Sequence, residues 1–202
     1  MNKFGHLETL PTGPFRFIAL DVETAGKSAG GICQIGLCFA DAAGHLQTYS
    51  VLVDPEEPFA PFNTELHGIS SETVAGAGNF PTVYMALYDI LNTHSLIQHS
   101  TFDEKALTAA CVRYDLPMIT SHWTNSVTVA RQAWPELKGA GGHGLANLKK
   151  HLGLAFHHHD AGEDARASAS VILKAEKVLG KPLSHLRLDR QLTFQFQKPP
   201  QK

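Results

Sequence analysis

The chain has 202 residues, 43% of them hydrophobic, which is enough for one large domain or two small ones. Its net charge is −2 with His neutral, which excludes the class of uniformly basic proteins that bind nucleic acid non-specifically. No apolar run is long enough to span a bilayer and the first residues lack an apolar signal core, so we expect a cytoplasmic protein without a membrane partner.

The N-terminal part of the sequence has the pattern of β-strands joined by short links. Strands are expected at residues 15–24, 31–40 and 46–53. The turn-like residues 41–44 separate the second strand from the third. Three consecutive strands with short links predict an antiparallel meander.

The rest of the chain mixes helical patterns with short apolar stretches. Helices are expected at residues 63–70, 81–91, 101–114, 145–152 and 161–179. A short strand is expected at 95–100, residues 127–134 fit either a strand end or a helix, and 139–144 are expected to form a flexible glycine loop. The order of elements predicts an α/β fold, a mixed sheet that starts with three antiparallel strands, continues with parallel strands and is flanked by helices.

We expect one domain over residues 15–180. An N-terminal extension, residues 1–14, precedes it, and a C-terminal tail, residues 181–202, follows it. The tail is either a disordered end or a docking segment.

The first strand ends with two carboxylates at alternate positions. Because successive side chains of a strand point to opposite faces, Asp21 and Glu23 share a face and lie about 6 to 7 Å apart along the strand. The strand is apolar on both faces, which is typical of a buried strand, where like charges repel unless a positive group lies between them. The alternative is a frayed strand end that reaches solvent.

Two of the expected helices begin their apolar stripe with an aspartate. Asp103 is in helical register with Leu107, and Asp164 is in register with Val171. Both acids are therefore expected to point toward the sheet. The alternative is that each only complements the dipole of its helix, which contributes up to about 1 kcal/mol.

The helix that contains Asp103 is expected to start with a capping box. Thr101 would be the N-cap, and Glu104 would be its partner at the third helical position.

The last helix has a similar start. If Asp160 is its N-cap, His159 precedes the cap and Asp164 is the fourth helical residue. The side chains at these two positions meet in the motif called a hydrophobic staple. His159 is thus expected to face the same site as Asp164. His157 and His158 are expected to be a solvated or adventitious metal-binding surface.

Four carboxylates and a histidine indicate a particular chemistry. Oxygen ligands without sulfur favour magnesium or manganese over zinc, and two divalent cations would balance four carboxylates. Two such ions clamp the attacking and leaving oxygens of an in-line phosphoryl displacement. A histidine with a pKa near its usual value of about 6.5 suits the general base, which is the role expected for His159.

Three motifs in order resemble those of the DEDDh 3′ to 5′ exonucleases. They are D21-V-E-T24, H99-S-T-F-D103 and H159-D-A-G-E-D164, and Q34-I-G36 and L66-H-G-I-S70 match as well. The family includes the proofreading epsilon subunit of bacterial DNA polymerase III, RNase T and oligoribonuclease. The resemblance implies an RNase H-like fold, two Mg²⁺ or Mn²⁺ ions bound by four acids, and His159 as the general base. The four acids are Asp21, Glu23, Asp103 and Asp164.

The resemblance also implies contacts with the terminal nucleotide. Thr24 would touch it, and Leu66, His67 and Phe102 would line its pocket or act as a wedge. The alternative for Leu66 and Phe102 is core packing. His99 stands where many members carry Asn, and it would contact a substrate phosphate, support the nearby aspartate or be a satisfied strand-end histidine.

The function implied is a metal-dependent 3′ to 5′ exonuclease that releases nucleoside 5′-monophosphates. Single-stranded DNA with a free 3′ end is the expected substrate, cut by a stand-alone enzyme or by a proofreader bound to a DNA polymerase subunit. RNA is the alternative substrate, because these motifs do not separate DNA from RNA. A non-catalytic nucleic-acid-binding or scaffold module is the alternative from another class.

Overall fold

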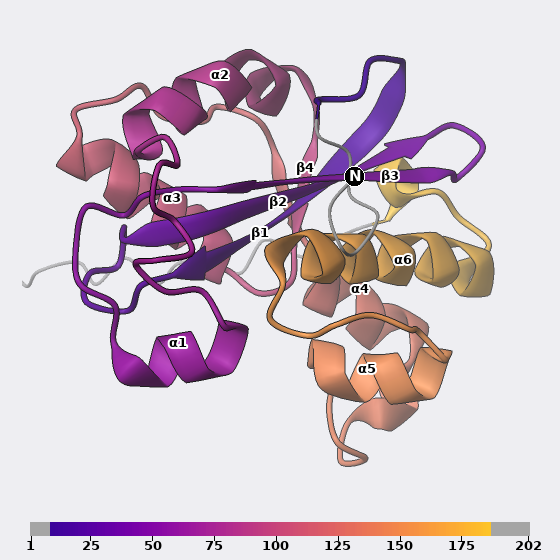
Figure 1. The fold of residues 1–202 in the computed structure, drawn as a ribbon. Helices are drawn as coiled ribbons and strands as arrows, with labels where there is room; N and C mark the ends of the chain where they lie inside the picture. Colours follow the sequence, from indigo (N-terminus) through magenta and orange to yellow (C-terminus); the bar gives the residue numbers. More distant parts are fainter. Residues whose placement is uncertain (1–8, 187–202) are drawn as a thin grey trace, which may run out of the picture.

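A computed structural model describes residues 9–186 and contains a five-stranded sheet with helices on both faces (Figure 1). The strand order is β3-β2-β1-β4-β5, with β1 antiparallel to β2, β2 antiparallel to β3, and β4 and β5 parallel to β1. This arrangement confirms the expected antiparallel start followed by parallel strands. The strands are β1 (Phe15–Thr24), β2 (Ile32–Asp41), β3 (Leu46–Leu52), β4 (Leu96–Gln98) and β5 (Trp123–Asn125). The sequence does not predict β5, because Trp123–Asn125 lies among polar residues and shows no apolar strand pattern.

The helices follow the predicted order. They are α1 (Pro61–His67), α2 (Phe80–Thr93), α3 (Phe102–Arg113), α4 (Ser126–Ala133), α5 (Leu145–Leu152) and α6 (Ala161–Leu179), with 3-10 turns η1 (Pro135–Leu137) and η2 (Leu183–His185). The sequence leaves residues 127–134 open between strand and helix, and the structure places 127–133 in α4 and Trp134 just after its end. The helix starts here because the Asn125 side chain accepts a hydrogen bond from the Val127 N–H at 2.9 Å.

The alternating side chains of β1 face two separate cores. Phe17 and Ala19 pack with residues of α4, α5 and α6, whereas Ile18 and Leu20 pack with residues of α2 and α3. Figure 1 shows α2 and α6 on opposite sides of the sheet. A strand covered on both faces is apolar on both faces, which explains the composition of β1.

The start of α6 rests directly on β2, and the sequence Gln34-Ile-Gly36 makes this contact possible. A Cβ atom at Gly36 would lie 2.1 Å from the carbonyl group of Ala161, so no larger residue fits there. The Gln34 side chain donates to Asp160 Oδ2 at 3.0 Å and accepts from the Ala161 N–H at 3.1 Å. These contacts fix where α6 begins, and therefore where Asp164 lies.

The chain continues to pack against the domain beyond residue 180, the expected boundary. The Leu183 N–H donates to Glu176 Oε1 at 2.7 Å, and Leu183 and Leu186 pack against the core on the α6 side of the sheet. The remainder of the predicted tail, residues 187–202, and the first eight residues of the extension lie outside the described residues. Between residues 9 and 186, no helix combines the length and apolarity that crossing a membrane requires.

We predict that Gly36→Ala destabilises the protein by about 3 kcal/mol, because the added methyl group meets backbone atoms that cannot rotate away. Urea unfolding measures the change. Gly144→Ala is the matched control, since Gly144 has a φ of −68° and no atom within 4 Å of the added Cβ. Equal losses in the two variants would show that the close approach of α6 to β2 does not limit residue 36.

Candidate active site

Asp103 reaches the end of β1 from the opposite side of the sheet to α6. The pairing of β1 with β4 extends only to Ala19 and Ile97, so β1 continues beyond its neighbour. Asp103 Oδ1 accepts a hydrogen bond at 3.1 Å from the N–H of Val22, in this part of β1. The Asp103 carboxylate therefore occupies the place beside β1 that a longer β4 would have filled, and it is buried there.

The start of α3 is not fixed by the predicted capping box. Thr101 is the N-cap, but its side chain makes no capping hydrogen bond. Gln98, the last residue of β4, takes over this role, since its Oε1 accepts from the Glu104 N–H at 3.1 Å and its Nε2 donates to Glu104 Oε2 at 2.8 Å. The longer glutamine side chain thus fixes the helix start that positions Asp103.

The capping pattern predicted for α6 is confirmed. Asp160 Oδ1 accepts from the Glu163 N–H at 3.1 Å, and Asp164 lies buried in the first turn. Asp21, Glu23 and Asp164 each offer a carboxylate oxygen, and these oxygens lie within 4.8 Å of one another. The alternative of a frayed strand end that reaches solvent is therefore wrong, because the end of β1 faces Asp164 of α6 and Glu23 is buried.

The acids are held where ionisation is unfavourable. Burial, with Asp164 and Asp103 nearby, raises the pKa of Glu23 to about 8. Burial raises the pKa of Asp103 to about 7, and burial together with the surrounding acids raises the pKa of Asp21 well above its usual value. Cations would relieve this cost, so the donor set fits divalent metal ions with oxygen ligands.

Two histidines, not one, meet Asp164. The Nδ1 atom of His158 lies 3.0 and 2.9 Å from the two carboxylate oxygens, and the backbone N–H of His159 donates to Oδ2 at 2.9 Å. The two imidazole rings stack with their centroids 4.1 Å apart. His158, expected to belong to a solvated or adventitious metal-binding surface, is exposed, but its ring also contacts the buried Asp164. His159 has a φ of 68°, and this turn of the backbone brings its neighbour's ring to the acid as well.

The pKa values of the two imidazoles are shifted in opposite directions. The hydrogen bond with Asp164 raises the pKa of His158, whereas burial and then the neighbouring His158 lower the pKa of His159. His159 is therefore the more readily available proton acceptor of the pair.

His99 is bonded through both ring nitrogens. Its Nε2 donates to the backbone carbonyl of His143 at 3.1 Å, and its Nδ1 lies 2.8 Å from Ser126 Oγ. Burial lowers the pKa of His99 to about 4, so the ring is neutral near pH 7. Of the three roles left open by the sequence, this geometry favours the satisfied strand-end histidine. Contact of His99 with substrate stays a prediction.

Thr24 anchors α1 to the end of β1. Its carbonyl oxygen accepts hydrogen bonds from Asn63 Nδ2 at 3.0 Å and from His67 Nε2 at 3.1 Å. Gly26 leaves room for this contact, because a Cβ there would lie 2.3 Å from the Asn63 side chain. The short helix, which buries none of its own residues, is thus held beside the acids by polar contacts.

Leu66 and Phe102 lie at the surface. Their exposed fractions are 41% and 52%, so the core-packing alternative is wrong for both. Leu66 and His67 line a groove of about 960 Å³ together with Tyr49, His158 and His159. Contact of Thr24, Leu66, His67 and Phe102 with a nucleotide stays a prediction.

Three polar residues organise the site in ways that the sequence does not predict: Gln34, which it shows only within a motif, Gln98, which it does not single out, and Asp160, which it predicts only as a cap. Gln34 and Gln98 are buried within β-strands, and each fixes the start of a helix that carries an acid. Asp160 was seen only as a cap, yet its charge also raises the pKa of Glu23. A polar residue inside an apolar strand was the available signal for the two glutamines.

A family model described as exonuclease, of the RNase T type, matches residues 18–172. The chain belongs to this family. The resemblance to the DEDDh 3′ to 5′ exonucleases is thereby confirmed, and the RNase H-like mixed sheet is the fold observed.

Curated relatives of this exonuclease chain include large polymerases. The PolC-type DNA polymerases III of Streptococcus pyogenes serotype M5 (strain Manfredo) and serotype M1 are 32% identical to it over 160 residues. The match covers 77% of this chain and 11% of each relative. The chain therefore spans about a tenth of the length of these polymerases.

Solved structures share the fold at low sequence identity. Exonuclease X in complex with 5′ overhanging duplex DNA has a TM-score of 0.66 and 22% identity, covering 81% of this chain and 93% of that one. The nuclease domain of 3′hExo, a DEDDh family member bound to rAMP, has a TM-score of 0.66 and 17% identity, covering 81% and 92%. The zinc-bound E. coli ExoI–ssDNA complex has a TM-score of 0.69 and 16% identity, covering 83% and 41%.

Without metal ions, the protein is predicted to lose about 2 to 4 kcal/mol of stability between pH 5 and pH 8. The pKa of Glu23 is raised from 4.5 to about 8, so the folded state keeps a proton that the unfolded chain releases. The resulting stability is present below pH 4.5 and is lost as the pH rises through 8. Mg²⁺ or Mn²⁺ should restore it at pH 8.

Urea unfolding at both pH values, with EDTA and then with metal, measures this effect. Glu23→Gln should flatten the dependence on pH, whereas Glu65→Gln, at an exposed position of α1, should leave it unchanged. Equal stability at pH 5 and pH 8 in EDTA would refute the claim that the buried acids repel one another.

Proposed function

We propose that the protein is a two-metal DEDDh 3′ to 5′ exonuclease that hydrolyses the terminal phosphodiester bond of single-stranded DNA and releases nucleoside 5′-monophosphates. The observation that carries this proposal is the convergence of three carboxylates from β1 and α6, two of them buried, within 4.8 Å of one another and beside a histidine pair. Family membership supports the reaction class. The domain that performs it is taken as residues 15–180.

The residues that would hold the metal ions are Asp21, Glu23, Asp103 and Asp164. Their hard oxygen donors, with no sulfur among them, favour Mg²⁺ or Mn²⁺. When bound, two such ions would supply an activated water and would stabilise negative charge on the leaving oxygen.

His159 is the general base of this proposal. Burial and the neighbouring His158 lower its pKa, so its ring is free to accept a proton at neutral pH. The hydrogen bond from its backbone N–H to Asp164 ties its position to the acids. His158 keeps the Asp164 carboxylate oriented through its Nδ1 atom.

The exposed apolar residues suit an unpaired nucleotide. Leu66 borders the groove beside the histidines, and Phe102 lies next to Asp103 at the start of α3. Apolar and aromatic contacts hold a base without reading its identity, and a single strand lets the terminal base unstack. The PolC-type relatives favour DNA over RNA as the substrate.

Association with a DNA polymerase subunit and a cytoplasmic location are further parts of the proposal. The similarity to PolC-type polymerases supports such an association, whether within one chain or between chains. The C-terminal tail is the segment proposed to dock.

We expect the protein to release mononucleotides from the 3′ end of labelled single-stranded DNA in Mg²⁺ or Mn²⁺, and to act more slowly on RNA of the same sequence. Asp21→Ala is the inactive control. Chromatography of the products checks both points. Faster release from RNA would make the protein an exoribonuclease, and no release from either would leave only a binding module.

Replacing the two histidines separately identifies the base. We expect His159→Ala to lower kcat by at least about 100-fold, because the proton acceptor is lost, and His158→Ala to lower it by less than about tenfold. The measurement is single-turnover cleavage of single-stranded DNA. A larger loss in His158→Ala than in His159→Ala would assign the base to His158.

A further inference from the structure

Residues 126–159, called the basic segment here, carry a net positive charge, whereas residues 9–125 and 160–186 do not. This segment contains α4, η1, the glycine loop, α5 and the three histidines. It has four Lys and Arg residues and one acid, Glu136, whereas residues 9–125 have four Lys and Arg residues and twelve acids. A protein with a net charge of −2 thus carries a local excess of three positive charges beside an acidic site.

The basic segment contains a pocket that presents two of its cations. The pocket has a volume of about 460 Å³ and is lined by Arg131, Pro135, Lys138, Gly142 and His143. Arg131 and Lys138 are exposed, and neither forms an ion pair within residues 9–186. Their charge is therefore available to an anion from solvent.

The glycine loop of the pocket is held in place rather than loose. His143 Nε2 donates to the Trp134 carbonyl at 2.8 Å. Asn147 Nδ2 lies 3.0 Å from the Ala140 carbonyl oxygen and 2.7 Å from that of Gly142. A Cβ at Gly141 would lie 2.6 Å from the Asn147 side chain, so a glycine is needed for this contact. The sequence-based expectation of a flexible loop overlooked these bonds.

The same loop is connected to the active site. His99 donates to the His143 carbonyl, and His99 directly follows Gln98, the residue that fixes the start of α3. The pocket and Asp103 are therefore positioned by two adjacent residues at the end of β4. This link gives the pocket a set position relative to the acids.

We propose that the pocket formed by Arg131 and Lys138 binds a backbone phosphate of the substrate strand, on the 5′ side of the bond that is cut. The inference rests on the proposed function. An acidic site repels a polyanion until metal ions are bound, and cations held nearby supply the attraction that brings the strand in. A phosphate contact of this kind is independent of base sequence, which suits an exonuclease.

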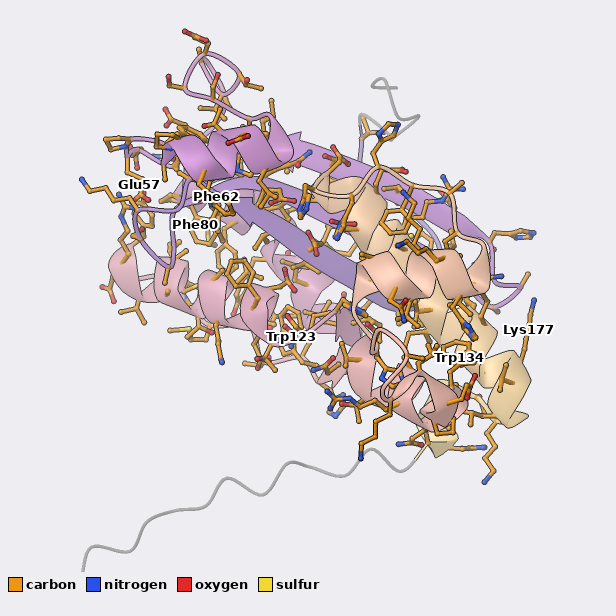
Figure 2. All side chains as sticks on the ribbon, turned by 90° about the horizontal axis from the view of Figure 1, so that it is seen from below. Glu57, Phe62, Phe80, Trp123, Trp134 and Lys177 are labelled. Carbon is orange, nitrogen blue, oxygen red and sulfur yellow. The ribbon has the colours of Figure 1, made fainter. Side chains whose placement is uncertain are left out.

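The test compares two double variants in the full chain. Arg131→Ala/Lys138→Ala removes the pocket cations. Lys174→Ala/Lys177→Ala removes two exposed cations near the C-terminal end of α6 and is matched in charge. Figure 2 shows Lys177 at the other end of the molecule from Phe62 of α1, the helix tied to Thr24 at the end of β1. Circular dichroism and thermal unfolding confirm that each variant folds.

Binding of a fluorescent oligothymidylate is measured by anisotropy in EDTA, where no cleavage occurs, over a range of salt concentrations. The pocket variant should bind at least about tenfold more weakly, and its slope of log K against log salt should be smaller by about 0.7, since each neutralised phosphate of a single strand contributes about 0.7. The α6 variant should match the wild type. Equal binding by the pocket variant and the wild type would overturn the proposal, and would leave an acidic protein surface as the ligand to examine.

Cleavage in Mg²⁺ is the second readout. The pocket variant should raise KM for the oligonucleotide by about tenfold with kcat unchanged. It should hydrolyse the p-nitrophenyl ester of thymidine 5′-monophosphate like the wild type, because that compound has no phosphate on the 5′ side of the bond. A loss on the small ester equal to the loss on DNA would overturn the phosphate assignment. Because binding is measured without turnover, absence of cleavage would refute the proposed function and leave the binding result standing.

Discussion

The removal of like-charged carboxylates from water at the end of β1 is the constraint on which the rest of the structure depends. Burial and like charge raise the pKa values of Asp21, Glu23 and Asp103, so folding places these groups where they are costly. The arrangement persists because each acid belongs to an element that is anchored elsewhere. The site therefore stores an electrostatic cost that divalent cations would relieve, and their binding would couple to stability.

The anchors are neutral polar side chains inside apolar strands. Gln34 on β2 bonds the first residues of α6, and Gln98 on β4 bonds the first turn of α3. Each amide both donates and accepts a hydrogen bond at a helix start, so its burial leaves no polar atom unpaired. The same bonds fix the position of the helix along the helix axis. Two helices from opposite faces of the sheet thus bring their acids to one place. The acids are held there by the glutamine contacts, because contact between the acids themselves is unfavourable.

Charge is separated within a small volume. The carboxylates lie at the end of β1, and the basic segment that ends in the histidines lies beside them. His99 joins the two regions through its hydrogen bonds to Ser126 and to the His143 carbonyl. A metal-dependent enzyme that acts on a polyanion needs both an acidic centre for metal ions and a cationic surface for phosphates.

Local patterns in the sequence determined most of the elements, though not β5 or α4, and identified the acids. The alternation of β1 placed Asp21 and Glu23 on one face, and the cap at Asp160 set the start of α6, because both features depend only on neighbouring residues. Only the tertiary structure decided that β4 stops early enough for Asp103 to bond Val22, that Gln98 replaces Thr101 as the capping group, and that His158 meets Asp164. These contacts depend on strand register and on how helices from both faces approach one strand end, and no local pattern encodes those distances.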